Sequence, residues 1–193
     1  MNIRAFASLL AAVLSLTQCQ KNGGYPDYPM PPVTQTGANT AGCYVDGHLW
    51  VANYYAPPVG STSTPVGATW RNHHQKGPSI QVGMIKTIAD ESDVHNDTDI
   101  SLTVAGVDRP GTYVLDQAPA YPGFPFNSAG SFFFTQKSPV QKFVTGPGFT
   151  GKVVVTRLDT VARVVSGTFE FTGRQDATGA TVRVTGGQFD ATF

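Results

Sequence analysis

Charged residues, cysteines and long apolar segments are all scarce in this chain of 193 residues. Only 13% of the residues are charged, about half of the average for soluble domains, so long charged helices are not expected. The 13 Lys and Arg residues are balanced by 13 Asp and Glu residues. Without a surplus of basic residues the chain lacks the positive electrostatic potential that attracts the phosphate backbone of a nucleic acid. Nucleic acid is therefore not an expected partner.

The first of the two cysteines follows an apolar run at the N-terminus. Residues 1–4 make a short positive start, and the apolar residues 5–16 are too few for the ~20 that span a bilayer. This pattern is typical of a signal peptide. Leu16 and Cys19 resemble the lipobox of bacterial lipoproteins, although Gln18 stands where a small residue is usual. We therefore expect cleavage after Gln18 and acylation of Cys19.

A multiply acylated Cys19 would anchor the protein stably without a basic patch, since two or more acyl chains are enough. The expected location is the bacterial cell envelope, at the outer membrane, with the membrane as a partner through this lipid. Only Cys43 then remains, so no disulfide within the chain is expected. Cys43 begins a segment of alternating apolar residues, which predicts a buried thiol.

The composition of the chain on the two sides of the lipobox predicts three segments. Residues 20–41 are rich in Gly and Pro and have almost no aliphatic side chains, so burial would not offset their ordering entropy. We expect a signal peptide at 1–18, a lipidated cysteine and flexible tether at 19–41, and a single domain at 42–193. About 150 residues is an ordinary size for one domain.

From Cys43 onward the apolar residues alternate with polar ones, as in half-buried strands. Asp46 and Gly47 favour a tight hairpin turn. The parity of the apolar positions changes between Val184 and Phe189, and the glycines at 186 and 187 predict a β-bulge there. The expected fold is all-β, an antiparallel β-sandwich or barrel-like domain of about eight or nine strands.

Two connections, residues 52–78 and 116–130, are longer than a minimal scaffold needs and are rich in aromatic residues. Aromatic faces stack on the C–H faces of sugars and on apolar side chains. The candidate ligand-binding residues are Tyr54, Tyr55, Trp70, Tyr121 and Phe124. The alternative is that these rings cap an open end of the fold.

Residues 90–99 contain five carboxylates. Oxygen-rich loops can hold Ca²⁺, and the weak candidate ligands here are Asp93, Asp97 and Asp99. The alternative is a solvated hairpin loop, and no other cofactor is expected. No nucleophile elbow, zinc motif or carboxylate pair nominates a catalytic residue, and the glycines of 146–151 fit a turn better than a nucleotide site.

The run PPVTQTGANTAGC at 31–43 resembles the opening signature of a family of uncharacterised lipoproteins from Bacteroidota. Further blocks at 110–113, 165–171 and 184–190 extend the resemblance. It implies a lipoprotein with an all-β domain, and it transfers no catalytic residue because the family has no established activity. Asp159, Thr160 and Val161 resemble an O-glycosylation acceptor of Bacteroidota, and a plain turn is the alternative.

These observations predict a non-enzymatic binding module for a glycan, a peptide or an envelope protein. A structural or assembly component of an envelope complex is the alternative, and a hydrolase assembled from distant residues ranks third.

Overall fold

The structure is a computed structural model, and it describes residues 28–54, 64–73, 77–87, 97–119, 127–135 and 140–193. These residues form eleven strands that pair antiparallel in one sheet, which confirms the all-β expectation. The strands are β1 (Thr40–Val45), β2 (His48–Val51), β3 (Val66–His73), β4 (Gly77–Lys86), β5 (Thr98–Ala105), β6 (Gly111–Leu115), β7 (Ala129–Phe134), β8 (Gln141–Val144), β9 (Gly151–Asp159), β10 (Val164–Arg174) and β11 (Thr181–Thr192). The number exceeds eight or nine because β8 has only four residues and because residues 52–78, expected to be one long connection, contain the eight-residue strand β3.

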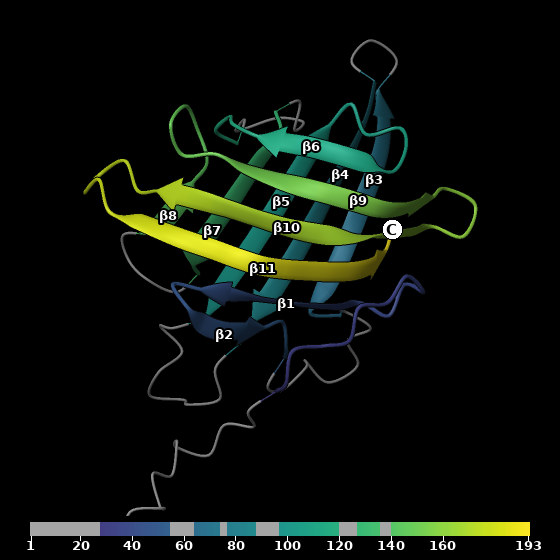
Figure 1. Cartoon of the computed structure of the whole chain (residues 1–193), viewed down its shortest axis with the longest axis horizontal. Helices are drawn as coiled ribbons and strands as arrows, with labels where there is room; N and C mark the ends of the chain where they lie inside the picture. The colour runs from purple at the N-terminus through teal and green to yellow at the C-terminus, as the bar shows by residue number, and fades with distance from the viewer. Residues whose placement is uncertain (1–27, 55–63, 74–76, 88–96, 120–126, 136–139) are drawn as a thin grey trace, which may run out of the picture.

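The sheet curls strongly into a half-barrel, so that two groups of strands face each other (Figure 1). The front layer contains β6, β9, β10, β11, β1 and β2 in that spatial order, and the back layer contains β8, β7, β5, β4 and β3. A single pairing between Arg174 and Val144 joins β10 to β8 and makes the two layers one sheet. In Figure 1 the front strands cross steeply over those of the back layer.

The core lies between the two layers and contains the apolar side of each alternating strand. From the back layer it takes Ile80, Val82, Met84, Ile100 and Leu102, all of which are fully buried. The front layer contributes mainly valines and phenylalanines. Cys43 is also fully buried, as predicted, and burial raises the pKa of its thiol to about 12.

Two local predictions about the backbone are confirmed. Asp46 and Gly47 both have positive φ, 49° and 83°, and they join β1 to β2 in a hairpin. The register of β10 against β11 shifts beside Gly186, where φ is 58°, and one extra residue of β11 is accommodated. The shift puts both Val184 and Phe189 into the core.

The N-terminal segment differs from the expected tether. Residues 28–40 lie against the front layer, and Gln188 donates a hydrogen bond to the carbonyl of Pro31. Met30 and Pro31 pack close to Gly42 of β1. Composition alone predicts little order here, but the partners that hold this segment come from β11. In the described part of the chain no helix is long and apolar enough to cross a membrane.

Candidate functional site

A row of small residues runs across the outer face of the back layer. The register pairs Gly67 of β3 with Gly83 of β4, Gly83 with Ser101 of β5, and Ser101 with Ser131 of β7. Because alternate residues of a strand share a face, this row lies on the side opposite the core. Two glycines and two serines from four neighbouring strands are therefore aligned across the sheet.

Larger side chains border the row on both sides. Asp99 pairs with Ile85 on one strand and with Phe133 on another, and this forms the first wall. Thr69 and Gln81 pair with each other and form the second. The two walls are four residues apart along each strand, about 13 Å at ~3.3 Å per residue.

Gly67, Gly83 and Ser101 of this row, together with the walls, line an open hollow of about 650 Å³, which we call the trench. Tyr54 and Pro65 complete the first wall beside Ile85. The backbone N–H of Asn53 donates to the carbonyl of Ile85 at 2.9 Å, and this bond places Tyr54 at the Asp99 end. A space of this size accommodates a small ligand.

The two glycines of the floor are not required by the backbone or by packing. Neither Gly67 nor Gly83 has a positive φ, and a Cβ atom built on either would meet nothing within 4 Å. Glycine inside a strand costs roughly 0.5–1 kcal/mol relative to alanine. What these two glycines provide is the open space of the trench itself.

Asp99 brings an unsatisfied carboxylate to the first wall. Its Oδ1 atom is buried and has no hydrogen-bond partner in the structure as described. Burial, together with the nearby charge of Asp97, raises the pKa of Asp99 to about 6. Among the described residues that line the trench, Asp99 carries the sole charge.

The structure places the predicted ligand residues in different parts of the molecule. Tyr54 lines the trench, whereas Trp70 lies on the opposite face of β3, where it packs against the core and lies 6.3 Å from the ring of Phe193. The structure therefore does not bring Trp70 together with Tyr54. Outside the described residues lie Tyr55, Tyr121, Phe124 and the lipidation candidate Cys19.

The predicted cation ligands are only partly described. Asp97 and Asp99 lie at the start of β5, and Asp93 is outside the described residues. Over the described ranges, no three His, Cys, Asp or Glu residues group closely enough to hold a metal ion.

A second carboxylate, Asp190 of β11, has a contrasting environment. Its two oxygens accept hydrogen bonds from the Thr34 hydroxyl at 2.7 Å and from the backbone N–H groups of Thr36, Gly37 and Ala38 at 2.9–3.0 Å. We call these five residues the clasp. The hydroxyl of Ser166 donates a further bond at 2.7 Å. Burial alone would raise the pKa of Asp190, but these donors outweigh it and hold the pKa well below its usual range.

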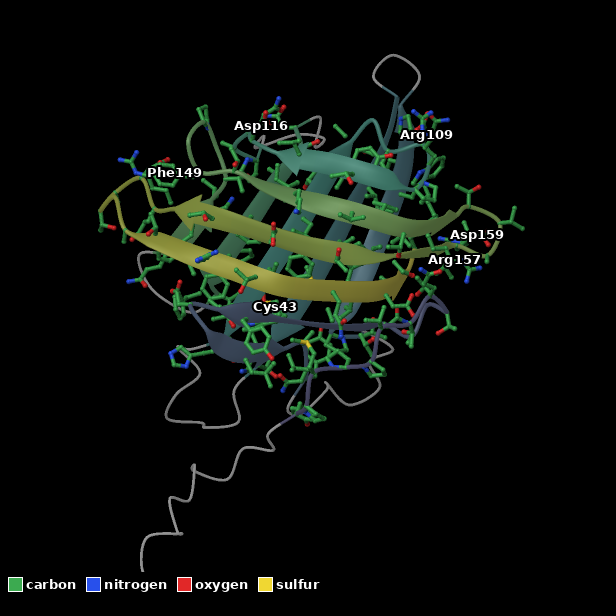
Figure 2. All side chains as sticks on the ribbon, viewed as in Figure 1. Cys43, Arg109, Asp116, Phe149, Arg157 and Asp159 are labelled. Carbon is green, nitrogen blue, oxygen red and sulfur yellow. The ribbon has the colours of Figure 1, made fainter. Side chains whose placement is uncertain are left out.

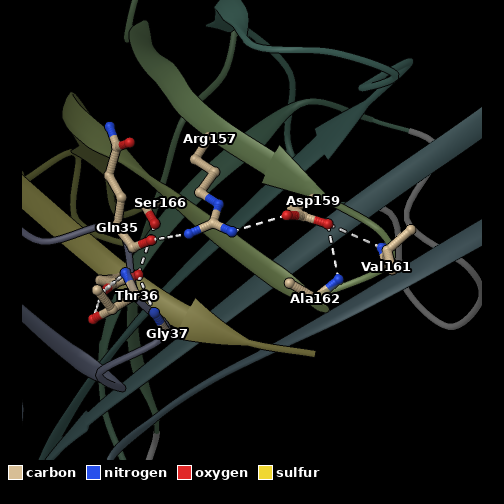
Figure 3. Close-up of polar contacts among 9 residues, drawn as sticks. Gln35, Thr36, Gly37, Arg157, Asp159, Val161, Ala162 and Ser166 are labelled. Carbon is tan, nitrogen blue, oxygen red and sulfur yellow. Dashed lines mark hydrogen bonds and ion pairs between the residues drawn. The ribbon is translucent and has the colours of Figure 1, made fainter.

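Arg157 strengthens the attachment of the N-terminal segment beside the clasp. Its guanidinium donates to the carbonyl of Gln35 and pairs with Asp159 at 2.8 Å (Figure 3). Asp159 also accepts the N–H groups of Val161 and Ala162, and the Ala162 bond, followed by Arg157, lowers its pKa. The predicted acceptor Thr160 is thus exposed in an ordered turn.

The outer face of the front layer is also hollowed, but the one carboxylate among its described lining residues is paired. A hollow of about 390 Å³ is lined by β6, β9, β10 and β11. Lys152 and Glu170, which lie in it, form an ion pair at 3.1 Å. Figure 2 shows Arg157 and Asp159 together at one end of this layer and Phe149, which lies beneath Arg174, at the other. The unpaired carboxylate distinguishes the trench from this second hollow.

Comparison with known families gives one match. The profile of a family described as a domain of unknown function, DUF6252, matches residues 87–191, which is more than half of the chain. The chain belongs to the DUF6252 family. Comparison with the curated proteins and with the solved structures found no significant match.

The DUF6252 match begins after β4 and includes strands β5 to β11. Asp99 and Asp190 therefore both lie within it. Gly67 and Gly83 lie before it, so the trench is built from both the matched and the unmatched part of the chain. The family description carries no activity for this member.

Sequence reasoning missed Asp190 and the two floor glycines. The sequence does carry a signal for the glycines, because each stands at a polar position within an alternating strand, where glycine often marks a close approach by another molecule. No local signal identifies Asp190, since its partners on the N-terminal segment are 152–156 residues away.

Proposed function

We propose that this protein is a lipid-anchored binding module of the bacterial cell envelope and that the trench is its glycan-binding site. The observation that carries the proposal is the open floor of Gly67 and Gly83, kept without a backbone or packing requirement, beside the unsatisfied carboxylate of Asp99. A site built only for stability would fill this space and pair this oxygen.

The lining of the trench favours a sugar over other ligands. Tyr54 and Phe133 offer aromatic groups in one wall, and Thr69, Gln81 and Ser101 offer neutral hydrogen-bonding groups. Sugars need this combination, since their C–H faces stack on aromatic rings while their hydroxyl groups need donors and acceptors. The volume of about 650 Å³ is enough for a short oligosaccharide.

The anchoring part of the proposal rests on the N-terminal sequence. The apolar run of residues 5–16, the lipobox-like Leu16 to Cys19 and the resemblance to Bacteroidota lipoproteins all support acylation of Cys19. Between Cys19 and the first residues held by the domain, the chain is long enough to place the trench away from the membrane surface.

A glycan array tests the ligand site. The mature chain should retain short oligosaccharides, and Gly83→Phe, which fills the floor, should lower their retention at least ten-fold. Val114→Phe is the matched control, because it adds the same ring to the hollow of the front layer. Equal retention by both variants would remove the trench from consideration, and so would a wild-type protein that retains no glycan.

Palmitate labelling in a bacterial host tests the anchor. Cys19→Ala should lose the label and move to the fraction without membranes, while its β-domain keeps the wild-type melting temperature. Equal labelling of the wild type and the variant would show that Cys19 is not the acylated residue.

A further inference from the structure

We infer that the glycan carries a free primary amine and that its ammonium group binds Asp99 at the Tyr54 end of the trench. This inference rests on the proposed function, because it specifies the class of sugar for the same site. It follows from three features of that end: its charge, its unsatisfied oxygen and the position of the aromatic ring.

The charge of the trench is negative and is concentrated at one end. Asp99 is the charged residue among the described lining residues, and the nearby charge of Asp97 acts on its pKa. Arg71 occupies the outer face of β3 beyond Thr69, at the far end, and does not line the trench. A ligand that enters the Asp99 end therefore meets no cation among the described lining residues, and it is favoured if it carries a positive charge of its own.

The carboxylate of Asp99 lines the trench with an incomplete set of hydrogen bonds. Its Oδ1 atom is shielded from solvent and has no partner among the described residues. An ammonium group in the trench compensates the charge of the whole carboxylate and donates a charge-assisted hydrogen bond to it, about twice as strong as a neutral one. A sugar hydroxyl would leave the charge of the carboxylate uncompensated.

Tyr54 adds a second attraction for a cation at this end. The hydrogen bond of Asn53 to Ile85 fixes the main chain next to Tyr54 beside the wall that contains Asp99. A ring near a carboxylate binds an ammonium group through its π face, while the rest of the ring stacks on the sugar. A peptide lysine would use the same charge, but Thr69 and Gln81 supply neutral hydrogen-bonding groups that the hydroxyls of a sugar need and a lysine stem does not.

Calorimetry with three matched tetrasaccharides tests the inference. The probes are a glucosamine tetramer, its fully N-acetylated form and a glucose tetramer with the same linkage, all at pH 7. The glucosamine tetramer should bind at least ten-fold more tightly than the other two. Asp99→Asn, which keeps the shape and removes the charge, should reduce this preference below about three-fold, with an unchanged melting temperature or a higher one.

Ser101→Ala is the control for general damage to the trench, because it removes a neutral group and should weaken all three probes equally. Equal binding of the three probes by the wild type, abolished by Gly83→Phe, would overturn the amine and leave the glycan site intact. If no tetramer binds, both proposals fail. Tighter binding of a lysine tetrapeptide than of the glucosamine tetramer would overturn the assignment to a sugar.

Discussion

Asp99 and Asp190 are both aspartates of one sheet, yet their surroundings are opposite. Asp190 receives donors from the N-terminal segment and from Ser166, and its pKa is lowered. Asp99 keeps a buried oxygen without a described partner, and its pKa is raised to about 6. The hydrogen bonds of Asp190 are therefore supplied by the chain itself, whereas those of Asp99 are left incomplete among the described residues.

The difference separates a structural carboxylate from one that is available to a ligand. The donors of the clasp satisfy both oxygens of Asp190, so nothing from outside can improve its bonding. Asp99 stands in an open hollow whose floor is formed by two glycines and a serine. Burial of an acid is therefore not by itself a sign of function, and the supply of donors decides between the two roles.

The largest expected effect is the loss of Asp190. Asp190→Ala removes the acceptor for two hydroxyls and three backbone N–H groups of the N-terminal segment, and a donor left unpaired away from water costs about 1–3 kcal/mol. We expect the free energy of unfolding in urea to fall by about 3 kcal/mol or more. Asp99→Ala is the matched control and should change it by less than about 1 kcal/mol. Equal losses would end the distinction between the two acids.

The glycines of the two layers should also differ. A Cβ atom on Gly187 would lie 2.6 Å from the ring of Phe169, whereas one on Gly83 would meet nothing within 4 Å. Gly187→Ala should therefore destabilise the protein by about 1–3 kcal/mol through overpacking. Gly83→Ala should stabilise it by about 0.5 kcal/mol. Thermal unfolding measures both, and a large loss for Gly83→Ala would show that this glycine has a structural role.

The pH dependence of stability should have opposite signs for the two acids. The lowered pKa of Asp190 contributes stability above the unfolded pKa of about 3.9, and this contribution is lost as the pH falls through the folded value. The raised pKa of Asp99 means that the folded protein binds the extra proton between about pH 4 and 6, so its contribution to stability falls as the pH rises through that range. Urea unfolding across pH 3–7 measures how the free energy of unfolding changes with pH. Asp190→Asn should abolish the rise of stability with pH, and Asp99→Asn should abolish the fall between about pH 4 and 6.

The smallest effect concerns Asp99 alone at neutral pH. Because a charged Asp99 lacks a donor, Asp99→Asn should leave the melting temperature unchanged or raise it slightly, by the equivalent of less than about 1 kcal/mol given its partial exposure. A clear drop in the melting temperature would mean that the carboxylate has an internal role.

The sequence was sufficient for features decided by neighbouring residues. The hairpin at Asp46, the bulge at Gly186 and the burial of Cys43 follow from local turn chemistry and alternation, and all three were predicted. The trench depends on a register that aligns Gly67 with Ser131 across three strand pairings. The attachment of the expected tether depends on Asp190, far along the chain. Such long-range pairings leave no periodic trace in a single sequence.

The position of β11 has a consequence for the order in which the protein folds. This last strand lies between β1 and β10 in the sheet. Before residues 181–192 are synthesised, β1 can pair only with β2 and has no strand that connects it to β10. Closing a loop of this length is entropically costly and slow compared with forming a hairpin. β1 and the N-terminal segment therefore reach their final pairing only after residues 181–192 have been synthesised, so the Asp190 contacts are among the last to form.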